Sequence, residues 1–218
     1  MSTQALGWAA LVTVALLGLS PAAAHAQQRS DYSRLEGYGA FGFGGDAALR
    51  RTAPIVGDVR STGGLEPTYG FGLRHTTPLH EYAAVSGLVE AVTMQWDTNG
   101  AERRWVFDFS VMPQLRFLLE VGGFFLEPYL GIPIGFTFSM LENLDDTRSP
   151  HGDEPWPGLN LGAMAGVRLI TDLHFGAFVE AGWRHHQVWT RYAVLNSDYE
   201  ANITHNQFAL NAGVLWLY

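Results

Sequence analysis

The chain has 218 residues, of which 47% are hydrophobic and only 16% charged, and its formal net charge is -8 at pH 7. This acidic balance argues against a nucleic-acid-binding protein, because such proteins present basic surfaces. After residue 20 the apolar residues form no run long enough for a membrane-spanning helix, so they must be spread by alternation. The lack of cysteine suits a protein made in an oxidising compartment, where a stray thiol is a liability.

The beginning of the chain predicts export. Residues 6–19 are apolar and uncharged, and they are followed by Ser20-Pro21 and the small-residue site Ala24-His25-Ala26. This order is typical of a signal peptide, here residues 1–26 with cleavage before Gln27, and the apolar stretch is too short for a membrane-spanning helix. Residues 27–218 then form a single domain by length.

Eight later segments show the period of two that β-strands require. The clearest is Arg104–Leu119, where Trp105 and Phe107 alternate with Arg104 and Asp108. Such runs exceed an average soluble strand and approach the ~9–11 residues of a tilted membrane strand. We expect strands at 32–44, 66–79, 82–96, 104–119, 124–139, 158–170, 174–186 and 208–218.

The connections between these segments alternate in length. Short turns are expected at 80–81, 120–123 and 171–173, and long polar loops at 45–65, 97–103, 140–157 and 187–206. Transmembrane barrels have short periplasmic turns and longer outer loops. The sequence therefore predicts an all-β fold, an eight-stranded antiparallel up-and-down transmembrane β-barrel with both termini in the periplasm.

The last strand carries the strongest motif. One of its faces is apolar and ends on an aromatic residue: Phe208, Leu210, Ala212, Val214, Trp216 and Tyr218. The ending Trp216-Leu-Tyr218 resembles the signal by which outer-membrane barrels are recognised for insertion, and the chain resembles the small eight-stranded OmpA/OmpX-type barrels. The resemblance implies a monomer in the outer membrane of a Gram-negative bacterium, with outer-membrane lipid, lipopolysaccharide and the barrel assembly machinery as partners.

Charges on the other strand faces are expected to point into the lumen. A soluble lipocalin-like barrel would have the inverse polarity, with apolar residues inside. Because charges buried in a narrow eight-stranded barrel must pair, we predict an ion-pair network that fills the lumen and leaves no channel. Its acids are Glu36, Glu90, Asp108, Glu127 and Glu180, and its bases are Arg74, Arg104, Arg116, Arg168 and Arg184.

Three functional classes remain open. The pattern favours a non-enzymatic barrel with a structural or loop-mediated surface role. The first alternative is a lipid A-modifying enzyme, but neither His75-Thr76-Thr77 nor the outer-end set His185, His186, Glu142 and Ser139 forms a recognisable catalytic motif. The second is a passive carrier of small hydrophobic molecules, with a lateral opening near residues 82–96 or at Pro113 and Pro133.

No cofactor is predicted, and metal sites are weakly indicated. The acidic segment 140–157 is more typical of a solvated loop than of a cation site. His151, His205 and the pair His185-His186 could gather a transition metal, but adjacent strand residues point to opposite faces.

The hairpin around residues 120–123 allows a register prediction. Its two apolar faces have opposite numerical parity, so the turn must hold an even number of residues. A turn centred there pairs Phe117 with Leu126, places Arg116 directly across from Glu127, and sets Gln114 opposite Tyr129.

Overall fold

A computed structural model describes residues 31–53, 57–95, 103–141, 155–194 and 197–218. These residues form an all-β structure, and within those ranges there is no helix of the length and hydropathy needed to cross a bilayer. The strands are β1 (Arg34–Ala53), β2 (Gly57–Gly64), β3 (Thr68–His80), β4 (Ala83–Met94), β5 (Arg104–Arg116), β6 (Leu119–Val121), β7 (Phe124–Gly131), β8 (Ile134–Leu141), β9 (Trp156–Ile170), β10 (Phe175–Val194) and β11 (Ser197–Leu217).

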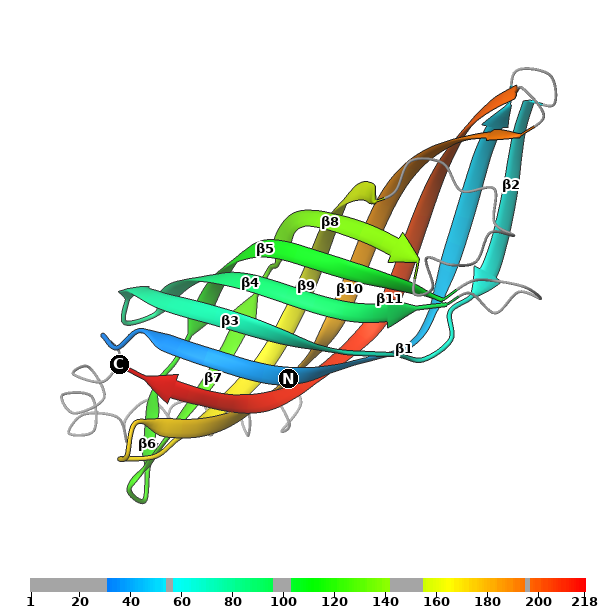
Figure 1. Ribbon diagram of the computed structural model, residues 1–218. Coiled ribbons are helices and arrows are strands. Elements are labelled where there is room, and N and C mark those ends of the chain that lie inside the picture. The colour runs from blue at the N-terminus through cyan, green and yellow to red at the C-terminus, as the bar shows by residue number, and fades with distance from the viewer. Residues whose placement is uncertain (1–30, 54–56, 96–102, 142–154, 195–196) are drawn as a thin grey trace, which may run out of the picture.

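The sheet closes into a ring of eight antiparallel strands (Figure 1). β6 continues β5, β8 continues β7 after a break at Ile132-Pro133, and β2 precedes β3 in the same hairpin arm. The ring runs β1, β3, β4, β5, then β7 with β8, then β9, β10 and β11, which pairs again with β1. The predicted fold class is thus confirmed.

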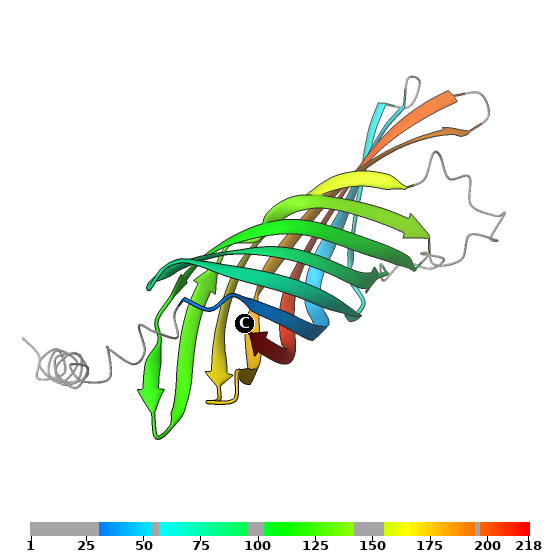
Figure 2. The same cartoon turned by 60° about the vertical axis from the view of Figure 1, so that its left-hand side comes forward.

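The stagger of the ring can be read from its register. Successive partners lead from Phe125 through Ile170, Gly176, Leu215, Glu36, Arg74, Leu88 and Ser110 back to Gly135, ten residues further along the same arm. Such a stagger forces the strands to tilt against the barrel axis, and in an eight-stranded barrel the interior is only wide enough for side chains. The tilt is plain in Figure 2.

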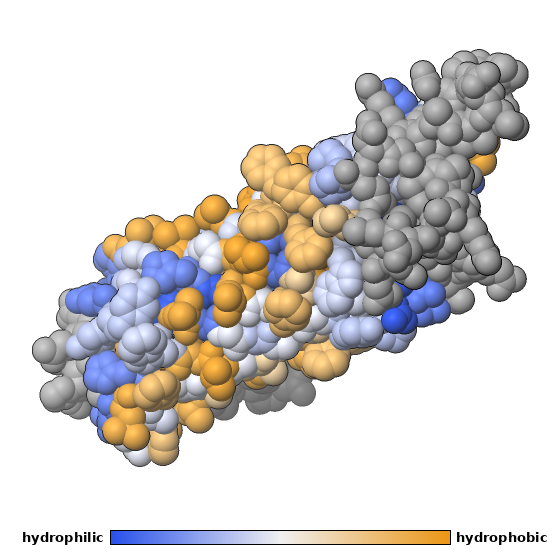
Figure 3. Space-filling model, in the orientation of Figure 1, coloured by the Kyte–Doolittle hydropathy of each residue, from blue (hydrophilic) through white to orange (hydrophobic). Residues whose placement is uncertain are grey.

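The polarity of the wall is that of a membrane barrel. Large apolar side chains are exposed on the outer face, including Phe71, Phe136 and Val214 at 63%, 65% and 68%, while charged side chains are buried inside. Orange apolar residues accordingly spread over the wall between its two ends (Figure 3). Aromatic side chains are also exposed near both ends of the wall, Tyr69 and Trp183 near one end and Phe117, Phe175 and Tyr218 near the other, whereas Trp105 is half-buried.

The turns at one end of the barrel are short, as expected. Gly122 and Gly123 join β6 to β7 and both have positive φ, at 58° and 87°. Two positive φ angles are what a tight type I′ hairpin requires, and glycine adopts them without steric cost. Only residues 81–82 separate β3 from β4, and only 171–174 separate β9 from β10. We call this the turn end.

Two of the expected long loops are instead strands. Most of 45–65 belongs to β1 and β2, and most of 187–206 to β10 and β11. These segments pair with one another in the order β2, β1, β11, β10 and project beyond the other strands as a twisted sheet (Figures 1 and 2). The prediction failed because their polar residues were taken as loop, although outside the membrane a strand needs no apolar face. We call this sheet, residues 46–53, 57–64, 187–194 and 197–206, the extension.

The extension begins at a bulge in β1. Between Phe43 and Asp46 the register against β11 shifts by one residue, and the two glycines of this bulge, Gly44 and Gly45, have φ values of 60° and 114°. A Cβ on Gly45 would lie 1.9 Å from the carbonyl oxygen of Asn206, whereas one on Gly44 would meet nothing within 4 Å. Bulges of this kind bend a strand and increase its twist, which directs the extension away from the barrel wall.

The predicted register of the β5–β7 hairpin is wrong by two residues. The even turn is present, but it lies at Gly122-Gly123, so Leu119 rather than Phe117 pairs with Leu126. Arg116 is opposite Tyr129, and Gln114 is opposite Gly131. Because the shift is even, every side chain stays on its predicted face.

Candidate functional site: the charged plug of the lumen

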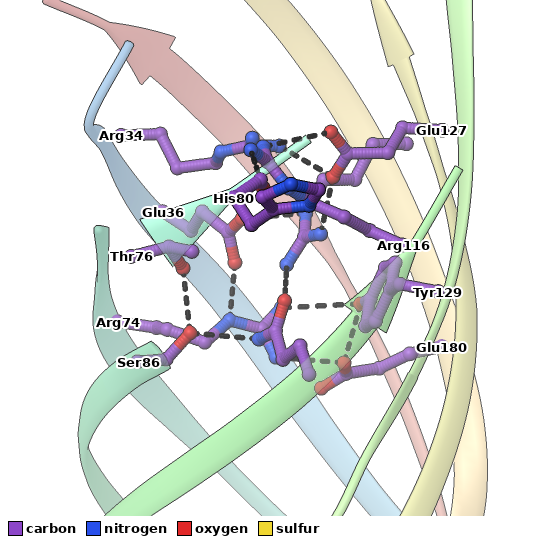
Figure 4. Close-up of polar contacts among 12 residues, drawn as sticks. Arg34, Glu36, Arg74, Thr76, His80, Ser86, Arg116, Glu127, Tyr129 and Glu180 are labelled. Atoms are coloured by element: carbon purple, nitrogen blue, oxygen red, sulfur yellow. Dashed lines mark hydrogen bonds and ion pairs between the residues drawn. The ribbon is translucent and has the colours of Figure 1, made fainter. Parts of the chain in front are cut away.

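All ten charged residues expected in the lumen are buried there, none with more than 7% of its surface exposed. Most of them contact one another through charged hydrogen bonds, in two clusters at different heights. The cluster nearer the turn end is built around Glu127, Glu36 and Glu180 (Figure 4).

Glu127 is the centre of the first cluster. Its Oε1 accepts hydrogen bonds from Arg34 at 2.6 Å and from Arg168 at 2.7 Å, and its Oε2 accepts one from Arg116 at 3.4 Å. Arg116 also donates to the backbone carbonyl of His80 at 3.1 Å. The contact between Arg116 and Glu127 therefore exists although the two residues are not directly opposite.

The next layer joins Glu36 and Glu180 through arginines. Arg168 donates to Glu36 at 2.7 Å, and Arg74 bonds both to Glu36 and, at 2.7 Å, to Glu180. Tyr129 donates a hydrogen bond to Glu180 at 2.5 Å. The guanidinium of Arg168 lies 3.7 Å from the centre of the Tyr129 ring. Each carboxylate thus has several donors, which offsets the cost of removing it from water.

Apolar side chains close the barrel below this cluster. Phe125 lies nearer than Glu127 to the Gly122-Gly123 turn, and Ile170 and Leu217 end their strands at the same level. All three are at most 5% exposed and belong to one buried cluster, with Leu118 packed against it. The described residues therefore seal the ion pairs from solvent at the turn end.

The second cluster lies toward the extension. Arg184 donates to Glu90 at 2.5 Å, and Glu90 also accepts a hydrogen bond from Tyr38 at 2.9 Å. Asp108 contacts His186 at 2.7 Å and accepts a hydrogen bond from Thr137 at 2.5 Å.

Arg104 occupies a separate position at the extension end. It donates to Ser139 Oγ at 2.9 Å, and its guanidinium stacks 3.5 Å above the ring of Trp156. Among the described contacts of Arg104 are therefore a hydroxyl and a cation–π interaction.

Two members of the plug were missed from the sequence. Arg34 is completely buried and bonds to Glu127, and His186 is 1% exposed beside Asp108. Arg34 has the same parity as Glu36 on β1, so the alternation itself could have identified it. With Arg34 included, the buried arginines of the described lumen are six and the acids five.

The expected assembly residues lie at the turn end. Trp216 and Tyr218 are exposed on the outer face, and their rings are 5.6 Å apart. The backbone N–H of Tyr218 donates to the carbonyl of Ser33 at 3.0 Å, and its ring stacks on His75. His75 thus lies on the outer wall, away from any lumen acid.

The candidate catalytic residues do not converge, and of the candidate metal-binding residues only His186 and His205 are paired with each other. His185 is on the outer face, bonded to Asn206 at 2.8 Å, while His186 points inward. Glu142 and His151 lie outside the described residues. Asp108 and His186 resemble the acid and base of a hydrolase triad, but the nearby hydroxyl of Thr137 is bonded to the acid instead of the base. In the ranges described, three or more His, Cys, Asp or Glu residues do not gather as a metal site.

Among solved structures, the chain is similar to the outer membrane protein OprG from Pseudomonas aeruginosa, with a TM-score of 0.63 and 11% identity over 87% of this chain and 97% of that chain. It also matches Neisserial surface protein A (NspA), with a TM-score of 0.43 and 13% identity over 84% of this chain and 97% of that chain. No protein-family model and no curated protein matches the chain. At such identities the likeness to OprG concerns the fold, an outer-membrane-type β-barrel.

Proposed function

We propose that this chain is an integral outer-membrane protein of a Gram-negative bacterium, non-enzymatic, with a closed lumen and a structural or binding role at the cell surface. The observation that carries this proposal is the buried charged plug, with Glu36, Glu127 and Glu180 each held by arginines and 2% exposed or less. A barrel that uses its interior for cross-linked side chains offers no aqueous path through it.

A selective pore has different requirements. A channel needs a wet constriction, commonly lined by charges of one sign, which bind an ion weakly enough to release it. Here charges of both signs are present, and most of the guanidiniums bind carboxylates, at 2.7 Å for Arg168 and Glu36 and at 2.5 Å for Arg184 and Glu90. Opening such a lumen would mean breaking several buried ion pairs at once.

A lateral carrier needs a gap in the wall, and the suspected breaks are bridged. Ile132 N–H donates to the carbonyl of Pro113 at 3.2 Å, and Gly162 N–H donates to that of Pro133 at 2.9 Å. β4, which was also suspected, pairs with β3 and β5 along most of its length. The two prolines therefore act as local irregularities in a continuous wall.

The surface role is assigned to the parts beyond the membrane. The extension carries polar and charged residues on its outer face, among them Asp46, Arg50, Asp58 and Arg60, and all but one residue of β2 are exposed. Loops and projecting strands on a rigid scaffold are common sites of recognition.

Recording ion currents across planar bilayers tests the closed lumen. We expect no steady conductance from the purified folded barrel, and none from a variant in which a short turn replaces residues 46–64. Long-lived open states in either protein would refute the plug. A current only after Glu127→Ala would support it, because the network would then be what closes the lumen.

The location in the outer membrane is tested through Tyr218. Deleting this residue removes the interfacial ring and its hydrogen bond to Ser33, so we expect the protein to fail to insert. Cell fractionation measures the yield in the outer membrane. Tyr218→Phe, which keeps the ring, serves as the control and should insert normally. A normal yield of the deleted form would count against the assembly signal.

A further inference from the structure

The two ring nitrogens of His186 differ in their contacts, because one is bonded to a carboxylate and the other has no described partner. Its Nε2 lies 2.7 Å from Oδ2 of Asp108, and the other carboxylate oxygen accepts the hydroxyl of Thr137. Its Nδ1 is buried and has no hydrogen-bond partner within the described part of the chain. Buried polar atoms are nearly always satisfied, so this nitrogen indicates a missing neighbour.

The contact with Asp108 determines what that neighbour can be. A carboxylate only accepts, so Nε2 must carry the proton, and in the neutral ring Nδ1 then has a free lone pair. A histidine that binds a metal ion through one ring nitrogen usually donates the N–H of its other ring nitrogen to a carboxylate or a similar acceptor. Such a carboxylate fixes the orientation of the ring and increases its basicity.

A second imidazole lies directly across the sheet. His205 on β11 is the paired residue of His186 on β10, and both are buried on the inner face. Side chains of directly opposite residues in an antiparallel pair start about 4.5–5.5 Å apart, which is close enough for two imidazoles to share one ion.

The position of the pair gives access from outside the bilayer. On the outer wall, the apolar row of Trp183, Phe208 and Phe43 ends just before the polar residues His185 and Asn206. His186 and His205 follow that row toward the extension, so they lie at the external edge of the barrel. Glu90 pairs with Arg184 at 2.5 Å, and Asp108 contacts His186 itself, so carboxylates accompany the cationic side chains at this height of the lumen.

We propose that His186 and His205 bind one divalent transition-metal ion of the Ni, Cu or Zn series, with Asp108 as the positioning carboxylate. Imidazole nitrogens suit these ions, and copper(II) should bind most tightly among them. The protein supplies two ligands, and water completes the coordination. This agrees with the described residues, among which no group of three or more His, Cys, Asp or Glu side chains could hold a metal ion. A site with two protein ligands exchanges its ion with the medium.

Copper(II) titration of the purified, folded barrel in detergent tests the site. Isothermal calorimetry measures the affinity, and electron paramagnetic resonance shows how many imidazole nitrogens contact the ion. We expect one site with two nitrogens, which loses at least about tenfold in affinity in His186→Ala and in His205→Ala. The matched control is His185→Ala, which removes the neighbouring histidine of the same strand from the opposite face and should leave the site unchanged.

Asp108→Asn separates positioning from coordination. We expect this variant to keep two nitrogens in the spectrum but to bind about 10–100-fold more weakly, as loss of a carboxylate partner does at other metal sites. Heat-modifiable migration on gels shows that each variant is folded, and if His186→Ala does not fold, His205→Ala carries the test. Equal binding by His185→Ala and His186→Ala, or a spectrum with a single nitrogen, would overturn the proposal and leave Nδ1 to a water molecule.

Discussion

Ion pairs between an arginine and a carboxylate occur in two regions of this protein with opposite consequences for stability. Arg74 and Glu36 form an ion pair in the plug with both side chains fully buried, whereas Arg50 and Asp58 form one in the extension with 65% and 47% of their side chains exposed. Buried charges that lose a partner are left uncompensated in a poor solvent, while exposed ones are rehydrated. Geometry alone therefore does not tell what an ion pair contributes to stability.

The largest effect should come from the carboxylate that holds most cations. Glu127→Ala leaves Arg34, Arg116 and Arg168 crowded together without their shared acceptor, and we expect a loss of roughly 3–5 kcal/mol in the free energy of unfolding. Urea titration in lipid vesicles measures it. Glu127→Gln, which keeps the shape without the charge, separates packing from electrostatics. A loss below about 1 kcal/mol would mean that this end of the lumen is wet.

Double-mutant cycles can rank the contacts inside the plug. Arg34 lies 2.6 Å from Glu127 and Arg116 lies 3.4 Å from it. We expect a coupling energy of about 1–3 kcal/mol for Arg34 with Glu127 and a smaller one for Arg116 with Glu127. The single and double alanine variants are compared by their free energies of unfolding in vesicles. The reverse order would show that Arg116 is the main partner of Glu127, as the register predicted from the sequence implied.

At the junction between the barrel and the extension, we expect Gly45 to be the position most sensitive to substitution. Gly45→Ala places a Cβ against the carbonyl of Asn206 at a φ that other residues rarely adopt, so we expect a loss of up to about 3 kcal/mol. Gly44→Ala is the control, since its Cβ has open space and only the positive φ costs about 1 kcal/mol. Equal losses in the two variants would show that the clash is relieved by movement of the extension.

The smallest effect is expected at the exposed pair. Hydrogen bonds from Arg50 and Thr52 lower the pKa of Asp58 below its ordinary value. The contact therefore exists above the ordinary carboxyl pKa and is lost as pH falls through the lowered one. Arg50→Ala should return the pKa of Asp58 toward its ordinary value, measured by NMR titration, without a detectable change in barrel stability. A marked loss of stability would contradict the contrast between the regions.

The sequence was most informative where the membrane imposes a rule. Alternation placed Arg74, Glu127 and Glu180 in the lumen and Val214 and Trp216 on the wall, because lipid on one side and a confined interior on the other leave few exceptions. The extension was missed because outside the bilayer neither face of a strand needs to be apolar. Polar composition therefore could not distinguish strand from loop in the extension.

The contacts inside the plug could be predicted only in part. Parity gives the face of a residue but not its height, and the height depends on the turn and on the stagger of the ring. The turn at Gly122-Gly123 moved the register by two, and side chains reach between layers, as Arg34 on β1 does to Glu127 on β7. His186 and His205 likewise became neighbours only through the pairing of β10 with β11.

The pairing of β1 with β11 constrains the order in which this barrel can be made. Arg34 is paired with Leu217, so the seam joins residues from nearly opposite ends of the described chain. Until β11 arrives, β1 presents a free edge, and open edges of this kind readily pair with other chains. Contacts of such long sequence separation also form slowly. The chain therefore depends on protection of its unfinished edge while it folds, and a molecule stalled before its last strand becomes a substrate for aggregation or proteolysis.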